Sequence, residues 1–175
     1  MNKPLILVVE DDPSVRNLIT TTLKTNDYRY VVAPNGSTAI METTSHNPEI
    51  ILLDLGLPDM DGVQVIQTVR SWSNAPIIVI SARSEDNDKI HALDAGADDY
   101  LTKPFSVEEL LARLRVTQRR LSLMTAEMFT ASSVFVNGKL KVDYAGGCAY
   151  LDENELHLTP IEYKLLCLLS KNVGK

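Results

Sequence analysis

The first 120 residues alternate between short apolar runs and longer segments that carry apolar residues at helical spacing. The apolar runs predict strands at residues 5–9, 28–33, 50–53, 76–80 and 100–101. The segments after them predict a helix that begins at Pro13 and further helices over residues 35–46, 63–69, 86–94 and 106–120. Because strands this apolar need cover on both faces, the alternation predicts a parallel sheet with helices on both sides.

The pattern changes after residue 121. Hydrophobic periodicity fades over residues 122–133, which predicts a linker. Beyond it, short apolar segments separated by Asn137-Gly138 and Gly146-Gly147 predict a small, mostly antiparallel sheet. Thr159 and Glu162 have the spacing of a capping box, which predicts one more helix from Pro160 to about residues 172–174. We therefore expect three parts, at residues 1–121, 122–133 and 134–175.

Composition narrows the class of protein. The chain of 175 residues has 45% hydrophobic and 23% charged residues, as soluble globular proteins have. Its net charge is −6, and neither half is basic enough for a nucleic-acid-binding surface. No apolar run is long enough for a membrane helix or a signal peptide, so we expect a cytoplasmic protein without a membrane partner. The two cysteines and three histidines have no metal-site spacing.

Acidic residues follow two of the predicted strands. Asp54 comes directly after residues 50–53, and Glu10, Asp11 and Asp12 come after residues 5–9. Ligands bind at the carboxyl ends of strands in such sheets, so these carboxylates predict a site for a hard cation and a nucleophilic carboxylate. The residues after the first strand could instead be an acidic helix N-terminus. Asp12 is assigned mainly to that capping role.

Four motifs carry a resemblance to a known family: Val9 to Asp12, Asp54 with Pro58 and Asp61-Gly62, Ser81-Ala82, and Lys103 to Phe105. With them, residues 5–120 resemble the receiver domain of two-component response regulators. The resemblance implies a flavodoxin-like, doubly wound five-stranded parallel sheet in the order 2-1-3-4-5. It therefore supports the α/β fold that the alternating pattern predicts independently.

The resemblance also implies roles for individual residues. Asp54 would accept a phosphoryl group from a sensor histidine kinase. Mg²⁺ would be bound by Asp11, Asp54 and the backbone carbonyl of Gly56, with Glu10 contacting it through water. Lys103 and Ser81 would contact the phosphoryl oxygens, and Ser81 with Tyr100 would form a conformational switch.

An enzyme of the haloacid-dehalogenase type is the rival interpretation. Such phosphatases also use an aspartate at a strand end with Mg²⁺, but they need a second aspartate two residues later as general acid. Gly56 occupies that position here. We therefore expect no enzyme activity beyond Mg²⁺-dependent phosphorylation and dephosphorylation of Asp54 itself.

Within the family, the chain resembles the OmpR/PhoB subfamily, whose members dimerise through the fourth helix, fifth strand and fifth helix. The charged residues of that face would be Lys89, Asp94, Asp98, Asp99, Glu109, Arg113 and Arg120. The resemblance implies a homodimer in which Lys89 pairs with Glu109 and Asp99 with Arg113 of the other chain, each pair occurring twice.

Residues 134–175 resemble the opening of the subfamily's winged-helix DNA-binding domain, with residues 158–163 matching the entry to its first helix. The recognition helix is absent, so we expect DNA binding only in a longer form. We also expect the apolar face of the helix after Thr159 to be mobile, misassembled or covered by another chain. The predicted function is a phosphorylation-dependent regulator of transcription. The alternative is a receiver and dimerisation module that acts without DNA.

Overall fold

The structure is a computed structural model that describes residues 3–131, 134–144, 146–152 and 154–170. The chain divides into two compact units, residues 1–117 and residues 118–175. Among the described residues, no helix combines the length and apolar character needed to cross a membrane.

The first unit contains five parallel strands in the order β2-β1-β3-β4-β5. This order confirms the predicted doubly wound α/β fold. The strands are β1 (Leu5–Val9), β2 (Arg29–Ala33), β3 (Ile50–Leu53), β4 (Ile77–Ser81) and β5 (Asp99–Thr102).

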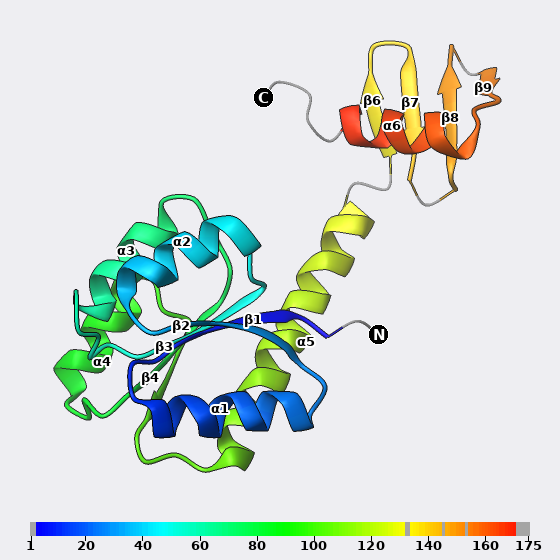
Figure 1. Ribbon diagram of the computed structural model, residues 1–175. Helices are drawn as coiled ribbons and strands as arrows, with labels where there is room; N and C mark the ends of the chain where they lie inside the picture. Colours follow the sequence, from blue (N-terminus) through cyan, green and yellow to red (C-terminus); the bar gives the residue numbers. More distant parts are fainter. Residues whose placement is uncertain (1–2, 132–133, 145, 153, 171–175) are drawn as a thin grey trace. The chain divides into compact units, whose positions relative to one another are not determined.

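Helices follow the strands one by one. They are α1 (Pro13–Thr25), α2 (Gly36–His46), α3 (Gly62–Arg70), α4 (Asp86–Asp94) and α5 (Val107–Ala131). In Figure 1, α1 and the first part of α5 lie on one face of the sheet, and α2 and α3 lie on the other. Residues Leu110 and Leu114 of α5 are completely buried, which shows that this helix contributes to the core.

The core follows from the period of two along each strand. Leu7 and Val9 of β1 belong to a buried cluster that includes Val65 and Ile66 of α3. The alternate residues of the same strand, Ile6 and Val8, are also completely buried. Successive strand residues point to opposite faces, so burial of both sets shows that each face of the sheet is covered.

Side chains cap the helices where the sequence indicates. Asp12 Oδ1 accepts hydrogen bonds from the backbone N–H groups of Ser14 (2.7 Å) and Val15 (3.0 Å), which confirms its role as the N-cap of α1. Asn35 caps α2 through Thr38 N at 2.8 Å. These caps satisfy backbone donors that the first turn of a helix leaves free.

The end of α5 differs from the prediction. We expected this helix to end near Arg120, whereas it continues to Ala131 and crosses most of the segment predicted as a linker. The sequence from Leu121 to Ala131 contains no Gly or Pro and is rich in Leu, Met and Ala, which favour helix. A weakening hydrophobic period therefore does not mark a helix end when local propensity remains high.

The second unit contains a four-stranded antiparallel sheet in the order β6-β7-β8-β9. Its strands are β6 (Val134–Asn137), β7 (Leu140–Asp143), β8 (Cys148–Leu151) and β9 (Asn154–Leu156). Gly138 and Gly147 have φ angles of +60° and +70° in the connections, a conformation that glycine adopts at low cost. The predicted antiparallel segment is confirmed.

One helix, α6 (Pro160–Ser170), completes the described part of this unit. Its capping box forms as predicted, because Thr159 N donates to Glu162 Oε2 at 2.7 Å. The Tyr163 hydroxyl donates to the Asp143 carbonyl at 2.8 Å and attaches the helix to β7. Leu165, Leu168 and Leu169 are more than half exposed, so the apolar face expected from the sequence is present. The predicted helix end at 172–174 lies outside the described residues.

Candidate functional site

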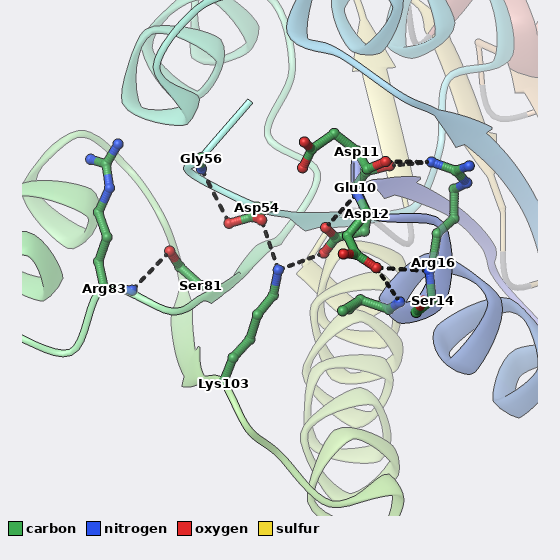
Figure 2. A network of polar contacts seen from close by, with 11 residues as sticks. Glu10, Asp11, Asp12, Ser14, Arg16, Asp54, Gly56, Ser81, Arg83 and Lys103 are labelled. Atoms are coloured by element: carbon green, nitrogen blue, oxygen red, sulfur yellow. Dashed lines mark hydrogen bonds and ion pairs between the residues drawn. The ribbon is translucent and has the colours of Figure 1, made fainter. Parts of the chain in front are cut away.

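The carboxyl ends of β1 and β3 bring three acidic side chains together. Val9 and Leu53 are register partners in the two neighbouring strands, so Glu10 and Asp54, the residues that follow, leave the sheet side by side. Carboxylate oxygens of Glu10, Asp11 and Asp54 lie within 4.8 Å of one another. Figure 2 shows this cluster, which the sequence predicts from the two strand ends.

Lys103 connects two of these acids. Its Nζ donates hydrogen bonds to Asp54 Oδ2 at 2.7 Å and to Glu10 Oε2 at 2.8 Å (Figure 2). The side chains of Glu10, Asp54 and Lys103 are only 2%, 9% and 16% exposed. Lys103 thus lies at the predicted acceptor Asp54, while its contact with phosphoryl oxygens remains a prediction. The contact with Glu10 was not foreseen.

Burial and charge shift the pKa values of this cluster. Burial raises the pKa of Glu10 above 4.5, and the charge of Asp54 adds to the effect, although the hydrogen bond from Lys103 opposes it. Burial alone would lower the pKa of Lys103. Its hydrogen bonds to Asp54 and Glu10 outweigh burial, so the pKa of Lys103 is raised above 10.5. Lys103 therefore remains a cation beside Asp54.

The donor set fits a hard divalent cation. Three carboxylates at one edge of a sheet supply the oxygen ligands that Mg²⁺ prefers, and no sulfur or nitrogen ligand competes in this group. The Asp11 side chain is exposed and can reach a hydrated ion, whereas Glu10 is buried. Gly56 lies next to Asp54, since Gly56 N donates to Asp54 Oδ1 at 3.2 Å. Ligation by the Gly56 carbonyl remains a prediction.

The two residues predicted as a switch meet at one loop. Ser81, the last residue of β4, is buried, and its Oγ accepts a hydrogen bond from Arg83 N at 3.3 Å. Tyr100 of β5 packs against the core, and its hydroxyl donates to the Arg83 carbonyl at 2.7 Å. The structure thus brings Ser81 and Tyr100 to the same residue, while their role as a switch remains a prediction.

The sequence did not indicate the role of Arg16, which binds the backbone of Glu10 and Asp11. Its Nη1 donates to the backbone carbonyls of Glu10 at 2.9 Å and Asp11 at 3.1 Å. The contact holds the backbone that presents both acids (Figure 2). No motif could reveal it, because the guanidinium binds main-chain atoms that every residue has.

Asp59 was also missed as a structural residue. It lies in the loop between β3 and α3, yet it binds the start of α2. Its carboxylate accepts hydrogen bonds from Gly36 N (2.8 Å), Ser37 N (2.9 Å) and Ser37 Oγ (2.7 Å). These bonds lower the pKa of Asp59 from 3.8 to about 2. The loop that carries Gly56 is therefore attached to the N-terminus of α2.

We expect Asp59→Asn to lower the denaturation midpoint at neutral pH, because an amide offers one acceptor oxygen where the carboxylate offers two. The folded-state pKa of about 2 lies below the ordinary value of 3.8. The stabilisation is therefore fully present above pH 3.8 and is lost as the pH falls toward 2. Urea titrations of both proteins from neutral pH downward should converge. Glu85→Gln is the control, since Glu85 precedes α4 without a side-chain capping bond. A constant difference at all pH values would contradict the assignment.

Four of the seven charged residues of the predicted dimer face form contacts within one chain. Arg113 Nη1 contacts both carboxylate oxygens of Asp99, at 2.7 and 2.9 Å, and Arg113 Nη2 contacts Glu109 at 2.9 Å. Asp98 Oδ2 accepts hydrogen bonds from Arg70 and Ile77 N, both at 2.8 Å. The interchain pairs of Asp99 with Arg113 and Glu109 with Lys89 would need these contacts to rearrange. Self-association through this face remains a prediction.

The sequence of this chain is similar to those of known proteins. The family of the response regulator receiver domain matches residues 6–115. The KDP operon transcriptional regulatory protein KdpE of Escherichia coli is 46% identical over 170 residues, which cover 97% of this chain and 74% of that protein. KdpE of Staphylococcus aureus is 43% identical over 170 residues, covering 97% and 72%. From the sequence alone, residues 55–59, 81–84 and 158–166 resemble regulators of the KDP potassium-uptake operon, and the identities to the KdpE proteins confirm this resemblance.

Solved structures show the same fold. The receiver domain of the Francisella response regulator 1452 superimposes with a TM-score of 0.65 at 34% identity, covering 68% of this chain and 99% of that one. The BeF3-activated receiver domain of Klebsiella pneumoniae RstA gives a TM-score of 0.63 at 36% identity, covering 66% and 98%.

Proposed function

Because this chain belongs to the response regulator receiver family, we propose that it accepts a phosphoryl group on Asp54 from a sensor histidine kinase and thereby controls transcription. One observation carries the proposal. The carboxylate of Asp54 lies within 4.8 Å of two further carboxylates and 2.7 Å from the Lys103 ammonium group. A nucleophile, a cation site and a fixed cation thus occur together at one edge of the sheet.

The chemistry is a phosphoryl transfer between a nitrogen and an oxygen. An Asp54 carboxylate oxygen attacks phosphorus, a new P–O bond forms, and the P–N bond of the kinase phosphohistidine breaks. The main obstacle is repulsion between two anions. Mg²⁺ held by Glu10, Asp11 and Asp54 would supply positive charge against that repulsion. Lys103 supplies a second positive charge, because it already contacts Asp54 and remains protonated.

The same geometry favours an acceptor over an enzyme that turns over substrates. A phosphatase needs a proton donor for the leaving group, and Gly56, two residues after Asp54, has no side chain to provide one. Its backbone N–H donates to Asp54 Oδ1 instead, which orients the carboxylate. We expect reactions only at Asp54 itself.

Control of transcription is proposed from the relatives. The matched KdpE proteins of Escherichia coli and Staphylococcus aureus are named transcriptional regulatory proteins. In this chain, the second unit carries the antiparallel sheet and the helix α6 that resemble the opening of a winged-helix domain. DNA is proposed as the partner of the winged-helix domain that this unit resembles.

The dependence on Mg²⁺ tests this function. We expect incubation with acetyl phosphate and Mg²⁺ to add one phosphoryl group to the chain, as measured by intact mass. Addition of EDTA before the donor should prevent the adduct, because repulsion then opposes attack. Asp11→Asn should raise the Mg²⁺ concentration that gives half-maximal adduct about tenfold or more, as loss of one carboxylate weakens the site. An equal adduct with and without Mg²⁺ would contradict the proposal.

A further inference from the structure

Arg83 is the residue at which the two candidate switch side chains meet. It lies in the loop after β4, two residues beyond Ser81. Its backbone N–H donates to Ser81 Oγ at 3.3 Å, and its carbonyl accepts from the Tyr100 hydroxyl at 2.7 Å. Both contacts involve main-chain atoms of Arg83. A displacement of this loop would therefore change the surroundings of Ser81 and Tyr100 together.

The side chain of Arg83 leaves in another direction. Figure 2 shows its backbone nitrogen facing Ser81 and its guanidinium extending away from it. Nη2 donates to Asp61 Oδ2 at 2.8 Å, and the hydrogen bond raises the pKa of Arg83. The other carboxylate oxygen of Asp61 accepts from Val63 N at 2.9 Å and caps α3. Asp61 also forms an isolated antiparallel bridge with Gly56.

These contacts connect the loop after β3, which follows Asp54, with the loop after β4, which carries Arg83. Gly56 is two residues from Asp54, so Asp61 is fixed beside the phosphorylation site by its bridge and by its cap. The guanidinium of Arg83 binds that fixed carboxylate. The two side chains are 38% and 39% exposed, and such an ion pair contributes little to overall stability. A weak contact of this kind can open and close, which a two-state element requires.

We propose that Arg83 is a positioning residue for the switch: its ion pair with Asp61 holds the loop after β4 where the loop binds Ser81 through its N–H and Tyr100 through its carbonyl. The inference rests on the proposed function, since it concerns the response to phosphorylation of Asp54. The resemblance to receiver domains implies that Tyr100 turns inward when Asp54 is phosphorylated, and the arrangement that Arg83 stabilises already holds the Tyr100 hydroxyl at the loop. The ion pair and the phosphoryl group therefore favour the same arrangement.

Linkage between the two sites gives the direction of the effect. Coupling between the position of the loop after β4 and ligand binding at Asp54 is reciprocal. If a ligand at Asp54 favours the loop position that Arg83 holds, a substitution that releases the loop must weaken binding of that ligand. Beryllofluoride is a suitable ligand, because related receiver domains are activated by it. We expect Arg83→Gln and Asp61→Asn each to weaken beryllofluoride binding about two- to fivefold, the range that a half-exposed ion pair can supply.

The experiment combines that affinity with a signal from Tyr100. Tyrosine-labelled protein is followed by NMR, and Tyr100→Phe identifies the Tyr100 signal. Asp61→Asn preserves the size and capping ability of the residue while removing its charge. In Arg83→Gln and in Asp61→Asn, the Tyr100 signal should move toward that of an exposed tyrosine even before beryllofluoride is added. Arg83→Lys should recover part of both effects, and the double variant should be no worse than either single variant.

Arg29→Gln is the matched control, because Arg29 and Glu49 form another exposed ion pair, 3.8 Å apart, away from the switch residues. It should change neither readout. An unchanged Tyr100 signal in folded Arg83→Gln and Asp61→Asn proteins, with unchanged beryllofluoride affinity, would overturn the positioning role alone. Failure of the unmodified protein to bind beryllofluoride would instead remove the proposed function, and the Tyr100 signal would still report whether the ion pair holds the loop.

Discussion

Asp54→Asn should abolish phosphorylation completely. The amide is nearly the same size as the carboxylate, so the fold is retained, but its oxygen carries no negative charge and is a poor nucleophile. We expect no phosphoryl adduct in intact mass spectra after incubation with acetyl phosphate and Mg²⁺, under conditions where the unmodified chain is largely modified. Circular dichroism should confirm that both proteins are folded.

A neighbouring acid provides the control for this result. Asp12 belongs to the same acidic stretch as Glu10 and Asp11, but its carboxylate caps α1. Because Asn is also a good N-cap, Asp12→Asn should leave the adduct in place. Phosphorylation that persists in Asp54→Asn and disappears in Asp12→Asn would show that the acceptor has been assigned to the wrong acid.

Lys103→Met should have the second largest effect, on stability as well as on phosphorylation. The substitution leaves Glu10 and Asp54, whose side chains are 2% and 9% exposed, without the cation that they share. Breaking a buried pair on one side is costly, and the partial exposure of the site reduces that cost. We expect the free energy of unfolding to fall by roughly 2–4 kcal/mol at neutral pH without divalent cations, as measured by urea titration.

The decrease in the free energy of unfolding caused by Lys103→Met should depend on pH and on Mg²⁺. The pKa of folded Glu10 is raised above 4.5, so its contribution to stability is greatest below that value and is lost as the pH rises. Without Lys103, the stability that Glu10 loses as the pH rises should be larger. The difference in free energy of unfolding between Lys103→Met and the unmodified protein should therefore increase between pH 4.5 and 7. Mg²⁺ should recover part of it by replacing the missing positive charge. A difference independent of both pH and Mg²⁺ would indicate lost packing instead of unpaired carboxylates.

The sheet was predictable because local and global signals agree in the first unit. The run from Ile50 to Leu53 is apolar at every position, as a strand covered on both faces must be, and turn residues bound it. Near residue 121 the signals disagree, since hydrophobic periodicity fades while helix-favouring residues continue. Helix propensity decides the structure at this point, and α5 extends to Ala131.

The sequence predicts the acidic residues of the candidate site but not all of the contacts that hold them. Parallel strands end at a common edge, so Glu10 and Asp54 could be placed together from the sequence alone. The hydrogen bond of Lys103 to Glu10 and the contacts of Asp59 with the start of α2 could not be predicted, because they depend on how two loops meet, which no strand end or motif spacing indicates. The contacts of Arg83 through its main chain leave no trace in residue type.

Location of the phosphoryl group on the chain tests the central claim most directly. After incubation with acetyl phosphate and Mg²⁺, borohydride reduction converts an aspartyl phosphate into a stable alcohol, and peptide mass spectrometry then identifies the modified residue. We predict that Asp54 alone is reduced, although Asp59 and Asp61 lie within the next seven residues. Reduction at Asp59, Asp61 or Asp11 with Asp54 unmodified would contradict the account.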